Sequence, residues 1–258
     1  MKLSRRLEMI MELIPNGSRL ADIGSDHAML PVAAVQTGRA AQAVAGEVNP
    51  GPFQAAVKQV AEAGLQGQIA VRRGDGLAVI EAGEVDVITV AGMGGSLIAS
   101  ILDNGQDKLG EVKLLILQPN VGEDILRRWL LEHHWLLTSE KILEEDGKIY
   151  EILTAIPEKE DERISSRLLY ESQQWPSSSG EGTFTVTTEL LLRMGPWLLK
   201  GPTSTLTDKW NGELDKLQGI LNSLSASKLE SAEMKSRQLR EEMDQIKEVL
   251  ACLQKDRR

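Results

Sequence analysis

An acidic, glycine-containing loop between a predicted strand and a predicted helix carries the residue types best suited to chemistry. In the stretch Arg19–Leu30, RLADIGSDHAML, a buried strand ends at Ile23, the chain turns at Gly24, and a helix opens at residue 28. A glycine turn lets the backbone approach a ligand closely, and the start of a helix offers unpaired N–H groups. Such turns also occur in strand–helix units that bind nothing, so the motif alone leaves an ordinary connection open.

The carboxylates of this loop indicate which ligand it could hold. Asp22 and Asp26 stand where a pyrophosphate would rest in a dinucleotide site, and the loop has no lysine and no G-x-G-x-x-G spacing. S-adenosylmethionine has no phosphate but carries a sulfonium and an ammonium group, so an acidic loop can bind it while rejecting NAD or ATP. The sequence therefore favours a methyl-donor site. His27 is a candidate general base, although a histidine satisfied within its own loop is the more ordinary interpretation.

Three further strand ends carry residues that suit the same donor. Glu47 ends the second strand and could accept hydrogen bonds from both ribose hydroxyls, or could cap the next helix. Asp75, in GDG, could accept from the adenine amino group, or could be a plain turn residue. In AGMGG, three glycines in four positions around Met93 indicate a backbone that turns sharply or passes close to a ligand, whereas Met93 itself could pack as core.

The loop after the fourth strand also bears on the acceptor. It reads AGMGG and not N-P-P-Y, the type that grips the exocyclic amine in many N6-adenine methylases. A ring nitrogen such as adenine N1 has an outward lone pair and no proton to remove, so it needs no general base. Catalysis would then rest on holding N1 in line with the methyl–sulfonium bond and excluding water. N1 lies on the Watson–Crick edge, so the base must be exposed or flipped out. We assign no catalytic residue.

Hydrophobic periodicity places these residues in alternating strands and helices. Helices are predicted at 4–14, 28–38, 52–63, 96–103 and 123–133, and strands at 19–23, 43–47, 68–72, 85–90, 113–118, 135–143 and 148–156. Ala91 to Gly95 is predicted as a loop, and Glu144 to Gly147 as a hairpin turn. Helices between strands imply parallel pairing, and the closing hairpin implies one antiparallel strand at the edge. The fold class is α/β, a Rossmann-like class I methyltransferase sheet of seven strands with the last one antiparallel.

The composition changes after Ile156. PEKEDER is charged, and WPSSSGEG (175–182) is predicted as a flexible loop. Two apolar series then step by three and four residues, as in a coiled coil: Leu206, Trp210, Leu214, Leu217, Leu221 and Leu224, and then Leu239, Met243, Ile246, Leu250 and Leu253. We predict a donor-binding domain over 1–156 and a helical C-terminal domain over 157–258, with an antiparallel coiled-coil hairpin at about 204–254.

Charge and composition restrict the partners. The net charge is −9, which on its face argues against nucleic acid, but binding needs only a local positive face. Residues 1–156 hold 14 basic and 21 acidic side chains and residues 157–258 hold 15 and 17, so the second part is nearer neutral. Candidate basic faces contain Lys2, Arg5, Arg6, Arg72, Arg73, Arg127 and Arg128.

No apolar run has the ~20 residues of a membrane span, and MKLSRRLEMIMELIP predicts an amphipathic helix and no signal peptide. We expect a cytoplasmic protein with no metal site, because Cys252 is the single cysteine and no histidine cluster has ligand spacing.

Six motifs, over essentially residues 1–156, resemble the bacterial tRNA (adenine-22-N1)-methyltransferase family: ADIGSDHAMLP, AGEVNPGPFQAA, VRRGDGL, ITVAGMGG, LILQPN and KIYEILTA. AGMGG together with LQPN is quite specific, whereas the D-x-G-x-D loop is shared with many methyltransferases. The resemblance implies S-adenosyl-L-methionine as donor, the D-loop region of tRNA as substrate, and a coiled-coil C-terminal domain. It implies nothing for 157–202.

Carried over residue by residue, the resemblance implies the cofactor-binding residues Asp22, Gly24, Asp26, His27, Glu47, Val48, Asp75, Gly76, Gly92 and Met93. Arg6, in LSRRL, would meet the methionyl carboxylate. As substrate-binding residues we propose Asn120, Arg127 and Arg128. The resulting hypothesis is a monomeric tRNA methyltransferase that methylates N1 of an adenine by direct in-line transfer.

Two rivals remain open from the sequence. The acidic composition favours a methyltransferase for a small-molecule or protein acceptor, which would share the donor site but not the RNA. A non-catalytic, donor-binding scaffold that assembles through the hairpin is the other. Binding of tRNA that depends on salt, and turnover on tRNA, discriminate the three.

Overall fold

The computed structural model describes residues 3–159, 165–225 and 230–255. The chain divides into two compact units, Met1–Ser166 and Arg167–Arg258. The first unit extends past residue 157 because Glu158 still bonds within it. The Glu158 N–H donates to the carbonyl of His134 at 2.8 Å, and its carboxylate accepts from the N–H of Ser166 at 2.8 Å. In the part of the chain that is described, no helix is long and apolar enough to cross a bilayer.

A seven-stranded sheet forms the first unit, with strand order β3-β2-β1-β4-β5-β7-β6. Its strands are β1 (Ser18–Ile23), β2 (Ala40–Glu47), β3 (Ile69–Arg73), β4 (Val87–Gly94), β5 (Leu114–Val121), β6 (Trp135–Glu145) and β7 (Lys148–Pro157). Strands β1 to β5 pair in parallel, and β7 is antiparallel to both of its neighbours. The prediction of seven strands with the last one antiparallel is confirmed.

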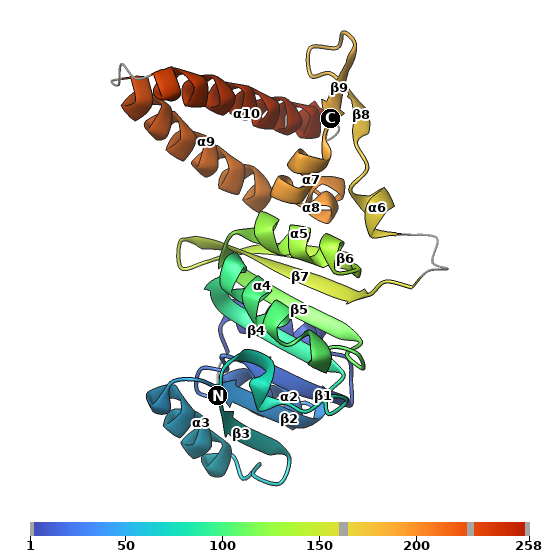
Figure 1. Cartoon of the computed structure of the whole chain (residues 1–258), viewed down its shortest axis with the longest axis vertical. Coiled ribbons are helices and arrows are strands. Elements are labelled where there is room, and N and C mark those ends of the chain that lie inside the picture. The colour runs from blue at the N-terminus through green and yellow to red at the C-terminus, as the bar shows by residue number, and fades with distance from the viewer. Residues whose placement is uncertain (1–2, 160–164, 226–229, 256–258) are drawn as a thin grey trace. The chain divides into compact units, whose positions relative to one another are not determined.

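The expected edge position of the antiparallel strand is wrong. Strand β7 lies between β5 and β6, so β6 forms the edge (Figure 1). The cause is the apolar run of β7, in which Ile152, Leu153 and Ala155 are all fully buried. Because the central positions of a sheet are covered on both faces, the more apolar strand of the hairpin takes the inner place.

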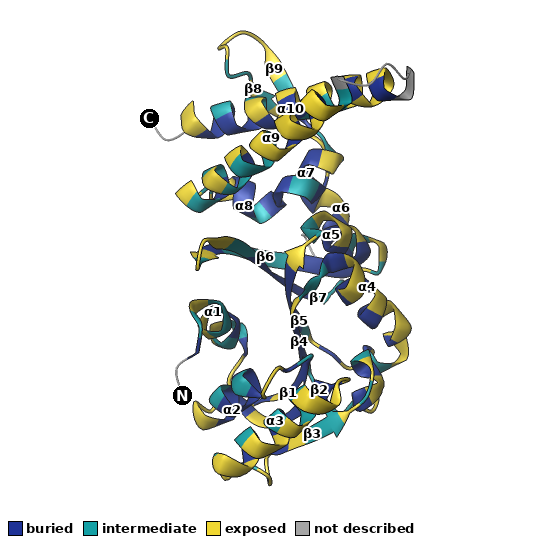
Figure 2. Cartoon of the chain, turned by 90° about the vertical axis from the view of Figure 1, so that its left-hand side faces the viewer, coloured by how far each residue is buried: buried dark blue, intermediate teal, exposed yellow. Residues whose placement is uncertain are grey.

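Helices cover both faces of this sheet, with α1 and α2 on one side and α4 and α5 on the other (Figure 2). The elements are α1 (Arg5–Leu13), α2 (Met29–Gln36), α3 (Pro50–Glu62), η1 (Gly76–Val79), α4 (Gly95–Asn104), η2 (Gln106–Lys108) and α5 (Glu123–Glu132). Helix α1 begins where Ser4 caps it, since the Ser4 hydroxyl accepts from the N–H of Leu7 at 3.3 Å. Its apolar stripe buries Ile10 and Ile14 against the core, as the periodicity predicts.

The segment Ala91–Gly95, predicted as a loop, is mostly strand. Strand β4 continues to Gly94, although its pairing with β5 is irregular on both sides of Met93. The glycines obscured the strand in the sequence because they lower strand propensity, whereas in the structure one of them forms a bulge.

The second unit is mostly helical. Its elements are α6 (Ser166–Leu169), β8 (Gln173–Pro176), β9 (Thr183–Val186), α7 (Thr188–Met194), α8 (Pro196–Lys200), α9 (Ser204–Ser225) and α10 (Glu230–Lys255). Helices α9 and α10 lie side by side (Figure 1), and every residue of the two predicted apolar series is buried or half-buried. The helical pair is therefore observed, while its coiled-coil winding stays a prediction and the turn at 226–229 lies outside the described residues.

The expected loop at 175–182 is a small hairpin. Strands β8 and β9 pair, and the turn closes where the N–H of Ser177 donates to the carbonyl of Gly182 at 3.1 Å. The carboxylate of Glu248 on α10 accepts from the N–H and hydroxyl of Ser178, both at 2.6 Å, and these bonds hold its pKa below the usual range.

Candidate active site at the carboxyl ends of the strands

The loop after β1 has a tightly wound backbone. Gly24 has φ +70°, and three successive residues that are not glycine, Asp26, His27 and Ala28, have φ of 35°, 64° and 53°. Left-handed conformations are unfavourable for such residues, and a run of them persists only where surrounding contacts hold it. Here the N–H groups of Gly24 and Ser25 donate to the carbonyl of Gly46, at 2.9 and 3.2 Å. The sequence predicted a turn at Gly24 and did not predict this run.

The buried carboxylate of Asp22 holds the start of this loop in place. Its side chain is 4% exposed, and its two carboxylate oxygens accept from the hydroxyls of Ser25 at 2.6 Å and Thr89 at 2.5 Å. Burial raises the pKa of Asp22 to about 6, and the two hydroxyl bonds offset part of that rise. Sequence reasoning missed Ser25 and Thr89. The only signal for Thr89 was a polar residue within the apolar strand VITV.

Glu47 joins the end of β2 to the same loop. Its Oε1 accepts from the N–H of Asp26 at 2.6 Å, and burial raises its pKa, against the lowering effect of that bond. Within the described residues its second oxygen, Oε2, makes no hydrogen bond. Asp26 itself points to solvent and contacts His27 at 3.4 Å between Oδ1 and Nε2. Three carboxylates, those of Asp22, Asp26 and Glu47, therefore lie at the neighbouring ends of β1 and β2, where their negative charge suits a cationic ligand.

The AGMGG segment meets this loop directly. A Cβ atom placed on Gly24 would collide with the terminal methyl of Met93, so the Met93 side chain lies directly against the turn. The parallel register places Ile23 opposite both Gly46 and Val90, which brings the ends of β1, β2 and β4 to one edge. The structure thus unites Asp22, Gly24, Asp26, Glu47 and Met93.

The remaining predicted donor-site residues share this edge less tightly. Val48 is 51% exposed, and Asp75 is exposed just after β3. Asp75 occupies the cap position of η1 without a side-chain capping bond, so its carboxylate is available to a ligand. Gly76, with φ +50°, packs against Ile101 and serves the turn.

Arg6 reaches the strand ends from α1. Its guanidinium carbon lies 5.1 Å from the ring centroid of Tyr150, and its Nη1 donates to the side-chain oxygen of Gln118. Asn120, two residues further along β5, is exposed and donates to the carbonyl of Gly92 at 2.8 Å. Arg6, Gly92 and Asn120 are therefore connected, and the connecting residue, Gln118, was not singled out from the sequence.

The prediction that Arg127 binds substrate is wrong. Its side chain is fully buried, where Nε contacts Glu140 Oε1 at 2.6 Å and Nη2 pairs with Glu151. It holds α5 against β6 and β7 and offers no charge to RNA. Buried carboxylates need a cation beside them, but the sequence does not show that these two glutamates are buried. Arg128 is exposed.

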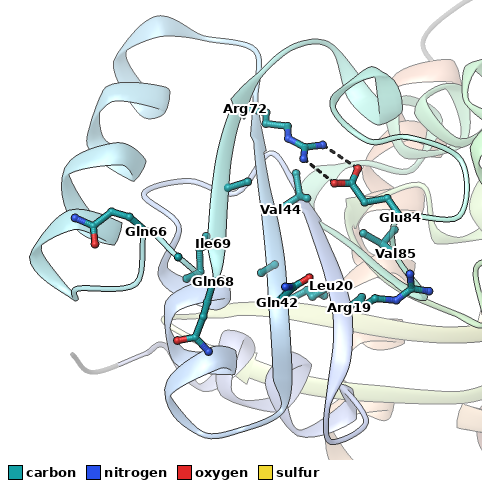
Figure 3. A pocket seen from close by; sticks show the side chains of 13 residues that line it. Arg19, Leu20, Gln42, Val44, Gln66, Gln68, Ile69, Arg72, Glu84 and Val85 are labelled. Atoms are coloured by element: carbon teal, nitrogen blue, oxygen red, sulfur yellow. Dashed lines mark hydrogen bonds and ion pairs between the residues drawn. The ribbon is translucent and has the colours of Figure 1, made fainter.

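A shallow cavity of about 210 Å³ lies elsewhere on the sheet, along the amino-terminal parts of β1, β2 and β3 (Figure 3). Arg72 and Glu84 form a bidentate pair across it, at 2.8 and 2.6 Å. Hydrogen bonding to Arg72 holds the pKa of Glu84 below its usual range. Since the cations on its wall are paired, and parallel sheets bind ligands at the other ends of their strands, it is not the donor site. Among the described residues no His, Cys, Asp and Glu cluster could hold a metal ion.

The fold is that of a Rossmann-like methyltransferase, as the strand order, the antiparallel strand β7 and the acidic glycine turn after β1 together indicate. A profile of the tRNA (adenine(22)-N(1))-methyltransferase family, TrmK, matches residues 20–248. The enzyme of that name from Bacillus subtilis is 43% identical over 251 residues, which are 97% of this chain and 98% of that protein. This chain belongs to the tRNA (adenine(22)-N(1))-methyltransferase family and is a methyltransferase. The family match continues far beyond residue 156, where the motifs found in the sequence ended.

Solved structures agree over nearly the whole chain. The crystal structure of the B. subtilis m1A22 tRNA methyltransferase has a TM-score of 0.84 and 42% identity, and covers 96% of this chain and 99% of that chain. A candidate tRNA (m1A22) methyltransferase of Streptococcus pneumoniae, solved in complex with S-adenosyl-L-methionine, has a TM-score of 0.78 and 39% identity. It covers 96% of this chain and 100% of that chain.

Proposed function

We propose that this chain transfers the methyl group of S-adenosyl-L-methionine to N1 of adenine 22 of tRNA. The observation that carries the proposal is the preformed acidic loop Gly24–Ala28 joined to Glu47, in a chain of this family. S-adenosyl-L-methionine supplies an electrophilic methyl group on a sulfonium. The adenine N1 lone pair forms the new C–N bond as the S–C bond breaks, and the products are S-adenosylhomocysteine and a cationic N1-methyladenine.

The donor site is assigned by the charges that face it. Glu47 Oε2 is the ribose acceptor, since its other oxygen is used by the loop. Asp75 serves the adenine amino group. Asp22 and Asp26 provide negative charge for the sulfonium and ammonium groups, and Arg6 provides positive charge for the carboxylate. The residues present thus fit a zwitterionic ligand with an extra cation and fit a pyrophosphate poorly.

On the acceptor side, the chain holds a base and moves no proton. N1 of adenine already has a free lone pair, so the rate depends on alignment with the methyl group and on water exclusion. Asn120 is exposed beside Gly92 at the ends of β4 and β5, where it can contact the flipped base. His27 has no required step in this scheme.

For tRNA binding we propose that residues 1–156 act on the base while residues 157–258 contact the rest of the tRNA. The smaller charge deficit of the second segment supports this division, and Arg128 remains the candidate cation from the first. Action as a monomer and a cytoplasmic location stay predictions.

The proposed function is tested by incubating the purified chain with unmodified tRNA transcript and S-adenosyl-L-methionine, followed by nucleoside mass spectrometry. We expect N1-methyladenosine from the wild-type transcript and none from a matched transcript in which adenine 22 is replaced by guanine. Absence of the modified nucleoside, or equal amounts from both transcripts, would overturn the proposal.

A further inference from the structure

A bulge at Gly92 interrupts the pairing of β4 with β5. Ala91 pairs with Gln118 and Met93 pairs with Pro119, so Gly92 is the extra residue, and its φ is +80°. A bulged residue loses its partners in the ladder. Gly92 is exposed, so its N–H and carbonyl take their hydrogen bonds either from water or from nearby side chains.

Two amide side chains of β5 supply the missing bonds. Gln118 Oε1 accepts from the N–H of Gly92 at 3.1 Å, and Asn120 Nδ2 donates to the carbonyl of Gly92 at 2.8 Å. Both polar groups of the bulged residue are thus held by side chains, one buried and one exposed.

Gln118 does more than hold the bulge. Its oxygen also accepts from Arg6 Nη1, and its Nε2 donates to the carbonyl of Pro119 at 2.7 Å and to Asn120 Oδ1 at 3.2 Å. The side chain is completely buried, and it uses two donor and two acceptor positions. A carboxamide with all its bonds made in a buried site has one orientation, because turning it over would place donors against donors.

Gln118 therefore bonds both to the residue assigned to the methyl donor and to the residue assigned to the acceptor base. Arg6, on its oxygen side, is the cation assigned to the donor carboxylate, and a Cβ placed on Gly92 would lie 3.5 Å from Arg6 Nη1. Asn120, on its nitrogen side, is the exposed residue at the acceptor end. Arg6 and Asn120 have no hydrogen bond to each other among the contacts of the described residues, so Gln118 is their shared partner.

We propose that Gln118 is a positioning residue that sets Arg6, and with it the donor, in register with Gly92 and Asn120 on the acceptor side. The inference rests on the proposed function, since it assigns the two sides as that function does. In-line transfer needs the methyl group and N1 aligned together, and a misplacement of about 1 Å can cost about 100-fold in rate. One buried amide that fixes both sides meets this requirement without touching either substrate.

The first measurement compares wild type, Gln118→Met and Thr154→Val. Methionine matches glutamine in size and removes all four bonds. Thr154 is the control because it is buried in β7 and its side-chain hydrogen bonds among the described residues go to Thr138 and Ser139, not to Arg6, Gly92 or Asn120. Donor affinity is measured by calorimetry, and kcat on tRNA is measured at saturating donor with folded protein. We expect Gln118→Met to weaken donor binding about 10-fold and to lower kcat about 100-fold, with both quantities within about twofold of wild type in Thr154→Val.

A purely structural role would give a different pattern. Gln118→Met would then unfold at lower denaturant concentration, while the folded fraction kept wild-type donor affinity and kcat. That result overturns the proposal.

A double-mutant cycle keeps the test decisive if Gln118→Met does not fold. Arg6→Lys, Asn120→Ala and the double variant are compared by kcat/KM for tRNA. Because Gln118 links the two side chains, we expect the fold-losses to differ from simple multiplication by about fivefold or more, as for coupled residues. Multiplicative losses overturn the proposal.

If the wild-type chain forms no N1-methyladenosine, the proposed function itself has failed, whereas an active wild type with uncoupled variants refutes only the role of Gln118.

Discussion

Two buried charged clusters lie in the same sheet, and they are satisfied in opposite ways. At the strand ends, the hydrogen bonds that Asp22 accepts from the described side chains come from the neutral hydroxyls of Ser25 and Thr89. At the other end of the strand order, where α5 packs on β6 and β7, Arg127 is paired with the carboxylates of Glu140 and Glu151. Hydroxyl bonds leave the negative charge of Asp22 uncompensated, which is consistent with its raised pKa. The comparison teaches that uncompensated charge marks the site, while compensated charge marks the scaffold.

The largest effect should come from breaking the compensated cluster. Arg127→Met removes the cation and leaves two carboxylates buried without it, so we expect a loss of about 3–5 kcal/mol in the free energy of unfolding. Urea denaturation measures it. The adjacent Arg128→Met is the matched control, and because Arg128 is exposed it should change stability by no more than about 1 kcal/mol. Equal effects of the two variants would refute the distinction.

The uncompensated charge of Asp22 should make the free energy of unfolding depend on pH. The pKa of Asp22 is raised from 3.8 to about 6, so between these values the folded chain retains a proton that the unfolded chain has released. The free energy of unfolding should therefore fall as pH rises through this window, by about 3 kcal/mol from this group, and stay lower above it.

Asp22→Asn isolates that contribution. Its amide can still bond the two hydroxyls but does not ionise, so the stability of the variant relative to wild type should rise between pH 4 and pH 6. Denaturation of both proteins at matched pH gives the difference. A difference that does not change with pH would mean that Asp22 carries no uncompensated charge.

The smallest effect concerns the backbone of the same loop. Ala28 has φ 53° immediately before α2, a conformation that glycine adopts without the steric cost. Ala28→Gly relieves that cost but also removes a fully buried methyl group, so the stability should stay within about 0.5 kcal/mol of wild type. Ala33→Gly, within α2, should destabilise the chain by about 1 kcal/mol. Equal destabilisation by the two glycines in thermal melts would contradict a relieved left-handed strain at Ala28.

The sequence predicted the alternation of strands and helices because local periodicity determines it, and α1 and the apolar series of α9 and α10 illustrate this. It predicted that Glu47 and the Gly24 turn lie close together because strand ends in parallel sheets meet at one edge. It failed where the answer depended on a distant partner. Arg127 and Arg128 are neighbours in sequence, and only the position of Glu140 and Glu151 shows which one is buried.

The same limit explains the other differences. Strand β4 continues through AGMGG because amide side chains of β5 support its bulge, and nothing within the glycine segment indicates that support. Likewise, the turn of the hairpin does not show which of its strands lies next to β5, and only the greater apolar content of β7 indicates it. Thr89, which acts on another residue, carries no motif of its own, and Gln118 lies in the LQPN motif without any sign there of the residues it bonds.

The most direct test of the account is the affinity for S-adenosyl-L-methionine of Glu47→Gln against wild type, measured by calorimetry. Glutamine keeps an oxygen for the N–H of Asp26 but replaces the second carboxylate oxygen, so the loop should stay folded while one ribose acceptor is lost. We predict donor binding about 10–100-fold weaker, as for a lost hydrogen bond to a charged group, and an unchanged affinity in Glu62→Gln on the exposed face of α3. Wild-type affinity in Glu47→Gln would contradict the assignment of the donor site to the ends of these strands.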